Sequence, residues 1–138
     1  RGPEVMAMAW PLLDDELKGR LPKLYSQEGE TDPVVHVLLL GAHGWIWALT
    51  EYSETAPDGC PHLAFGWVEG DFPELGYVPM DELDELNADC LDGCGYVWVD
   101  PDFVPRPLSQ VRAEADDIRR RLRETLEAGG HPVVRVRG

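Results

Sequence analysis

The chain has 138 residues, of which 43% are hydrophobic, and its 12 basic and 26 acidic side chains give a formal net charge of −14 at pH 7. This length fits one domain with a buried core, and the apolar content, which includes five tryptophans, excludes a disordered chain. No apolar run approaches the roughly 18 residues that a membrane-spanning helix requires, so we expect no membrane contact.

The two ends of the chain are expected to differ from its middle. We interpret residues 1–11 as a disordered or non-native lead, residues 12–106 as an α+β core domain, and residues 107–138 as a C-terminal helix and tail that pack on the core or extend from it. The N-terminal residues lack the basic and then apolar pattern of a signal peptide, and the three cysteines do not form a paired set. We therefore expect a cytoplasmic protein.

The first predicted elements are a short helix and a β-hairpin. Residues 12–21 carry a leucine at every fourth position from Leu13, which is typical of a helix with one buried face. The apolar run at 34–40 and the tryptophan-rich run at 45–52 predict two antiparallel strands, joined by the glycine-containing turn between them.

The middle of the chain predicts three more strands and a small helix. Residues 62–70 form the third strand, and Gly66 within it indicates a β-bulge or a close approach of two backbones. A fourth strand at 74–79, a small helix near 80–87 and a fifth strand at 96–99 follow.

A long helix is predicted from Leu108 to about Ala128, where apolar residues recur at spacings of three and four. Its other surface carries arginines and acids at the spacing of helical ion pairs, as in Asp116 to Arg120 and Asp117 to Arg121. A solvent-exposed, salt-bridged surface is the favoured interpretation, and docking of this helix on an acidic sheet is the alternative.

These elements together predict an α+β protein. We expect an antiparallel sheet of about five strands with a short N-terminal helix, a small helix near 80–87 and a long C-terminal helix.

Acidic and basic residues are unevenly distributed along the chain. Residues 24–105 contain 17 acidic side chains and neither lysine nor arginine. Such a region repels nucleic acid and attracts basic partners, so we predict a non-enzymatic module that binds a basic protein surface. The acids are densest at the predicted partner-binding residues Asp81, Glu82, Asp84, Glu85, Asp89 and Asp92. There are two alternatives. The acidity serves only solubility, or the chain pairs with a second copy of itself.

Seven aromatic residues occur on the predicted strands: Trp45, Trp47, Phe65, Trp67, Tyr77, Tyr96 and Trp98. A platform that stacks nucleic-acid bases has cationic flanks, whereas the flanks here are acidic. We therefore expect core packing, and we expect any aromatic face that stays exposed to form a protein interface.

Two loops contain residue types that bind zinc. Cys60 and His62 flank a proline, and Cys90 and Cys94 lie in an acidic, glycine-rich stretch. Four such ligands from two loops would complete a tetrahedral site, but neither spacing is the common one of two intervening residues. Reduced cysteines without a metal are the favoured interpretation, and we expect no cofactor.

A series of short motifs occurs in a fixed order along residues 12–86. A leucine-rich helix ends in Pro-x-Leu-Tyr, a Trp-x-Trp strand ends in Glu, and Phe-Gly precedes Glu-Leu-Gly-Tyr. Together with a Glu and an Asp-Pro after the helix and a closing Glu-Leu, these motifs correspond to Pro22, Leu24, Tyr25, Glu28, Asp32, Pro33, Trp45, Trp47, Glu51, Phe65, Gly66, Glu74, Leu75, Gly76, Tyr77, Glu82 and Leu83. In this order and spacing the chain resembles the bacterial domain-of-unknown-function family 2958.

The resemblance implies a small bacterial protein associated with plasmids and other mobile elements. Together with the acidic region at residues 24–105, this association favours a basic partner that handles DNA. Some family members are labelled single-stranded DNA endonucleases, and this label implies the alternative function. A nuclease of that kind requires carboxylates that converge on Mg²⁺ or Mn²⁺. Glu51 and Glu69 end two neighbouring predicted strands and Glu74 begins the next, so these three are the catalytic candidates of the alternative.

Overall fold

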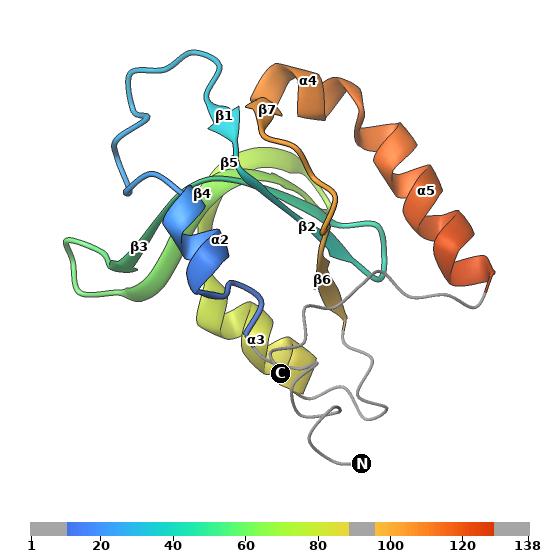
Figure 1. Ribbon diagram of the computed structural model, residues 1–138, viewed down its shortest axis with the longest axis horizontal. Coiled ribbons are helices and arrows are strands. Elements are labelled where there is room, and N and C mark those ends of the chain that lie inside the picture. The colour runs from blue at the N-terminus through green and yellow to red at the C-terminus, as the bar shows by residue number, and fades with distance from the viewer. Residues whose placement is uncertain (1–10, 89–95, 129–138) are drawn as a thin grey trace.

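A five-stranded antiparallel sheet lies between two layers of helices in the computed structural model, which describes residues 11–88 and 96–128 (Figure 1). The strand order is β5 (Pro73–Pro79), β4 (Pro61–Glu69), β3 (Ile46–Thr55), β2 (Val37–Gly41) and β6 (Val97–Val99). One face is covered by α2 (Asp15–Arg20) and α3 (Met80–Ala88), and the other by α4 (Leu108–Ala113) and α5 (Ala115–Glu127). The predicted α+β class is confirmed.

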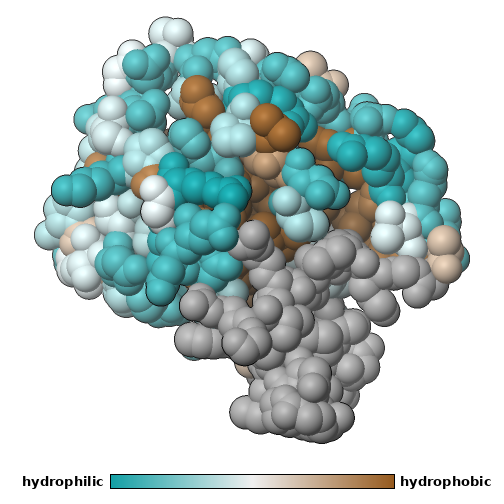
Figure 2. All heavy atoms as spheres, viewed as in Figure 1, coloured by the Kyte–Doolittle hydropathy of each residue, from teal (hydrophilic) through white to brown (hydrophobic). Residues whose placement is uncertain are grey.

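Strand β2 shows why the sheet carries both helix layers. All five of its residues are buried. Alternate side chains of a strand point to opposite faces of the sheet, so this burial requires that helices cover both faces. Val37 and Leu39 pack in the cluster that α2 and α3 cover, whereas Leu38 and Leu40 pack in the cluster under α4 and α5. In the space-filling view hydrophobic atoms show in the hollow between the helices, and hydrophilic side chains cover most of the outer surface (Figure 2).

The N-terminal helix α2 begins within the predicted range. The Asp14 side chain accepts a hydrogen bond from the Leu17 N–H at 2.9 Å, which satisfies a donor that the first helical turn leaves unpaired. Leu17 is the buried residue of the helix, and Leu13 and Leu21 on either side are buried in the same cluster. The leucine spacing therefore identifies the buried face correctly.

The predicted strand at 34–40 is divided at His36. The His36 N–H donates to the Leu49 carbonyl at 3.0 Å, and the two residues before it form a separate strand, β1 (Val34–Val35). Strand β1 pairs with β7 (Arg106–Pro107), which lies in the segment between the fifth predicted strand and the C-terminal helix. Val34 and Val35 thus pair with β7, whereas the pairing of β2 with β3 begins at Val37.

The predicted C-terminal helix is divided at Glu114 into α4 and α5. Glu114 has a ψ of 0°, and its carboxylate accepts a hydrogen bond from Arg106 Nε at 2.9 Å. This hydrogen bond lowers the pKa of Glu114. The anchored carboxylate holds the chain at the point where one helix ends and the next begins, so both can pack on the same face of the sheet.

Gly66 lies where two backbones approach closely, as predicted. A Cβ atom at this position would lie 2.0 Å from the Ala48 carbonyl oxygen of the neighbouring strand. The register of β3 against β4 shifts directly beside it, between Leu49 and Glu51. This β-bulge changes which face the following residues of β3 occupy.

The arginines of α5 make both kinds of contact that the sequence predicts. The Asp117–Arg121 ion pair is present at 3.4 Å, whereas Asp116 pairs with Arg119 instead of Arg120. Arg119 also reaches the sheet, where its Nη2 lies 2.8 Å from Glu69 Oε2. The helix therefore has a salt-bridged outer surface and is also docked on an acidic strand end.

Some predictions fall outside the described residues. They concern the interpretation of residues 1–10, the sites at Asp89, Cys90, Asp92 and Cys94, and the tail at 129–138. Within residues 11–88 and 96–128, no helix has the length and apolar character needed to cross a membrane.

Candidate functional site

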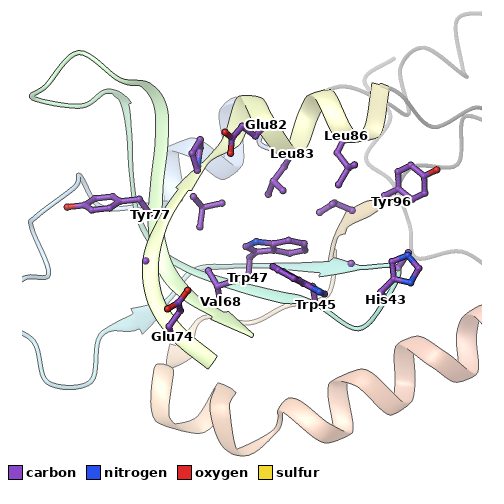
Figure 3. A pocket seen from close by; sticks show the side chains of 16 residues that line it. His43, Trp45, Trp47, Val68, Glu74, Tyr77, Glu82, Leu83, Leu86 and Tyr96 are labelled. Atoms are coloured by element: carbon purple, nitrogen blue, oxygen red, sulfur yellow. The ribbon is translucent and has the colours of Figure 1, made fainter. Parts of the chain in front are cut away.

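A groove with a volume of about 880 Å³ lies between α3 and the sheet (Figure 3). Leu83 and Leu86 point into it from the helix, and Trp47 and Trp45 face them from the sheet side. None of the sixteen described residues that line the groove is a lysine or an arginine. A concave, mostly apolar surface of this size with a few polar groups is typical of a binding site.

Two tryptophans form the aromatic floor of the groove. The rings of Trp45 and Trp47 lie 5.8 Å apart between centroids and are tilted by 35°. Trp47 is buried, whereas Trp45 is partly exposed. A Cβ atom at Gly70 would lie 2.4 Å from the Trp45 ring, so only a glycine lets the ring lie this close to the backbone.

The far end of the groove is fixed by Asn87, a buried polar residue of α3. Its Oδ1 accepts hydrogen bonds from the N–H groups of Tyr96 and Val97, both at 2.8 Å, and its Nδ2 donates to the Val97 carbonyl at 2.9 Å. These contacts attach the end of α3 to β6. They hold the backbone at Tyr96, whose partly exposed side chain lines the end of the groove.

Carboxylates lie along the rim. Glu74 from β5 and Glu82 from α3 line the groove and are exposed. Within the described ranges, Glu82 and its exposed neighbour Glu85 take part in no ion pair. Exposed carboxylates of this kind can contact a cationic ligand.

The other two predicted partner-binding acids of α3 have internal contacts. Asp81 Oδ1 lies 2.7 Å from His62 Nδ1, and Asp84 Oδ1 accepts a hydrogen bond from the Leu12 N–H at 2.9 Å. Burial raises the pKa of Asp84 above its ordinary value. Of the four described acids predicted to bind a partner, Asp81, Glu82 and Glu85 are exposed, and Asp81 already contacts His62.

A second pocket of about 330 Å³ lies on the opposite face of the sheet. Its aromatic wall consists of Tyr77, Phe65 and Tyr25: Phe65 and Tyr77 meet edge to face at 5.2 Å, and the two tyrosine hydroxyls lie 3.2 Å apart. On the helix side the Arg112 guanidinium lies 4.0 Å from the centre of the Trp67 ring, in cation–π geometry. Tyr77 lines both pockets, and Figure 3 shows its ring pointing away from the two tryptophans of the groove.

Glu51, a predicted catalytic carboxylate, has a structural role. It is 4% exposed, and its two oxygens accept hydrogen bonds from the Tyr25 N–H at 2.9 Å and the Gln27 N–H at 2.6 Å. Tyr25 has a φ of 71°, in the left-handed region that favours glycine. The carboxylate therefore stabilises a turn whose backbone conformation is unfavourable by itself.

Glu69 and Glu74 lie apart from Glu51. Glu69 pairs with Arg119, although no N–H of the guanidinium points squarely at the buried Oε2, so the contact is electrostatic rather than a hydrogen bond. Phe65 pairs with Glu51 in the sheet register, which separates Glu51 from Glu69 by four residues of β4, roughly 13 Å. Glu74 lines the groove on the other face. Among the described residues, no group of three potential metal ligands lies together.

Cys60 and His62, the described half of the predicted zinc site, contact other residues. His62 Nδ1 contacts Asp81 and its Nε2 lies 3.2 Å from Glu54, so both ring nitrogens face carboxylates. The Cys60 thiol is free and packs beside Leu24, Ala56 and Leu63.

Several residues that line the groove were not among the predicted site residues. Leu83 and Leu86 occur three positions apart on α3, a spacing that places both on one side of a helix and was available as a signal. Gly76 is different: a Cβ there would meet no atom within 4 Å, and this open space is a property of the assembled fold.

Comparisons of the chain with protein-family models, with curated proteins and with solved structures give no match. The resemblance to family 2958 therefore stays a prediction. The geometry of the two pockets and the charge distribution are the features from which a function can be inferred.

Proposed function

We propose that this protein is a binding module for a basic segment of another protein, which it takes up in the groove beside α3. The observation that carries the proposal is the composition of the groove: aromatic and aliphatic walls, two exposed carboxylates and neither lysine nor arginine among its sixteen lining residues. A lysine or arginine side chain has an apolar stem and a cationic end, and this surface offers partners for both.

Several interactions would contribute to such binding. A cation over an exposed tryptophan or tyrosine ring gains about 0.5–1 kcal/mol, and more where water is excluded. Trp45 and Tyr96 are partly exposed and line the groove with Glu74 and Glu82. Each exposed ion pair adds up to about 1 kcal/mol, so recognition depends on several weak contacts rather than on one strong bond.

The acidic surroundings of the groove support a basic partner as well. The net charge of −14 and the absence of lysine and arginine from residues 24–105 create a negative potential that speeds the approach of cationic surfaces. The further step, that the partner handles DNA, is supported by the resemblance to family 2958 alone.

The proposal is tested by titrating the protein with an arginine-rich peptide while its tryptophan fluorescence is followed. We expect saturable binding that weakens as salt is added, because salt screens exposed charges. Replacing both rim carboxylates, as Glu74→Gln with Glu82→Gln, is expected to weaken binding roughly fivefold to tenfold.

A matched control removes the same charge elsewhere. Asp102→Asn with Glu127→Gln also deletes two exposed acidic charges, but neither residue lines the groove. This variant is expected to bind within about twofold of the unmodified protein. Equal weakening in both variants would show that only net charge matters, and the groove would lose its assigned role.

A further inference from the structure

Strand β5 forms one edge of the main sheet. Each of its seven residues is paired with a residue of β4, from Pro73 opposite Glu69 to Pro79 opposite Leu63. Within the described part of the chain no strand pairs with its other side. Such an edge carries a row of backbone N–H and C=O groups that can pair with another strand.

The middle of β5 lacks the features that usually protect an edge strand. Sheets block their edges with prolines, charged side chains (lysine above all), bulges or very short strands. In β5 the prolines stand only at the two ends, the one charged residue is Glu74 beside the first proline, and the pairing with β4 has no register shift. The opposite edge strand, β6, has only three residues and therefore offers far less.

The two pockets lie on opposite sides of this strand. Glu74 and Gly76 line the groove beside α3, whereas Leu75 lines the second pocket, as the alternation of side chains in a strand requires. Leu75 and Tyr77 are 54% and 51% exposed, so the second face of the strand is apolar and accessible.

We propose that the basic partner binds as an extended segment that adds a sixth strand to the sheet along β5. This inference rests on the proposed function and specifies its mode. Backbone hydrogen bonds to β5 would supply affinity, and the pockets on the two faces would select alternate side chains.

The two faces select different side-chain chemistry. Side chains of the added strand that point toward the groove lie beside Glu74 and reach across Gly76, where the space is open, toward Glu82 and the tryptophan floor. Lysine or arginine fits there. Side chains on the other face lie beside Leu75 and Tyr77, where apolar or aromatic residues fit.

The recognised segment is therefore one in which basic and apolar residues alternate. A probe with this pattern is an eight-residue synthetic peptide of alternating arginine and leucine with blocked ends. Its binding is measured by the change in tryptophan fluorescence, with a peptide of alternating glutamate and leucine as the control for charge.

The decisive comparison uses two N-methylated forms of the arginine–leucine peptide. N-methylation of every second residue blocks the hydrogen bonds along one edge of an extended peptide and leaves the other edge intact, with all charges kept. Strand addition uses one edge, so we expect one methylated form to bind at least about tenfold more weakly than the other, since a lost backbone hydrogen bond costs about 1 kcal/mol and several are removed.

The outcomes separate this inference from the proposed function. If both methylated forms bind as tightly as the parent peptide, strand addition is overturned while binding of a basic segment stands. If the arginine–leucine peptide does not bind, or binds no better than the glutamate–leucine peptide, both proposals fail. A protein that dimerises alone, and whose dimer the peptide dissociates, would overturn the choice of partner in favour of a second copy of the chain.

Discussion

Strands β2 and β5 belong to the same sheet but have opposite environments. All five residues of β2 are buried, whereas only Val78 is buried among the seven residues of β5. Helices cover both faces of β2, and pockets lie on both faces of β5. The comparison indicates that one half of the sheet provides stability and leaves the other half free to bind.

The largest expected difference concerns leucines in these two strands. Leu39 in β2 is completely buried, and Leu39→Ala is expected to lower the free energy of unfolding by about 3–4 kcal/mol through lost burial and the cavity left behind. Leu75→Ala in β5 is expected to cost less than about 1 kcal/mol, because the side chain is more than half exposed. Urea denaturation of both variants measures the difference. Similar costs would contradict the division between the two halves.

Two directly paired glycines provide a second comparison. Gly66→Ala would place a Cβ against the Ala48 carbonyl oxygen and is expected to cost about 2–3 kcal/mol. Gly76, its register partner, has open space, and Gly76→Ala is expected to be neutral or to stabilise by up to about 1 kcal/mol. Thermal unfolding of the pair is the measurement, and a destabilised Gly76→Ala would refute the open space at β5.

Two glutamates sharpen the distinction between structural and binding acids. Glu51→Ala removes two hydrogen bonds to backbone N–H groups and is expected to lower the free energy of unfolding by about 2 kcal/mol. Glu74→Ala is expected to leave stability within about 0.5 kcal/mol, since the residue is exposed, and to weaken peptide binding instead. Stability and affinity are measured on both variants; an unchanged free energy of unfolding in Glu51→Ala would contradict its structural role.

The smallest expected effect is the pH dependence due to Asp84. Because burial raises its pKa in the folded state, the folded protein holds this proton more tightly than the unfolded chain does. Its contribution to stability is therefore favourable at low pH and is lost as the pH rises through the raised pKa.

Asp84→Asn keeps an oxygen that can accept the Leu12 hydrogen bond and removes the charge. The variant is expected to be slightly more stable than the unmodified protein at pH 7, with the difference disappearing below the ordinary pKa of aspartate. Denaturation curves at several pH values measure this, and a variant that is less stable at pH 7 would show that the charged form is favoured.

Much of the fold could be predicted from local patterns in the sequence. The apolar runs, the leucine spacing of α2 and the glycine within β4 identify elements whose existence depends on their own residues. The division at His36 could not be predicted, because it depends on the pairing of β1 with β7 across some seventy residues. The division at Glu114 accompanies its hydrogen bond with Arg106, which the spacing of the apolar helix residues does not reveal.

The candidate site could be predicted only in part. Charge density correctly indicated an acidic α3, but the hydrogen bonds that occupy Asp81 and Asp84 come from residues distant in sequence. Likewise, the sequence alone does not distinguish a catalytic acid at the end of a strand from an acid that stabilises a turn. For Glu51 the distinction comes from the turn at Tyr25, whose N–H donates to the Glu51 carboxylate.

Hydrogen exchange of the backbone amides, measured with and without the arginine–leucine peptide, tests the central claim most directly. We predict that the peptide slows exchange along Pro73–Pro79 in β5, where amides facing away from β4 gain partners, while the already protected amides of β2 do not change. Protection spread over α5, or no protection in β5 at saturating peptide, would contradict the account.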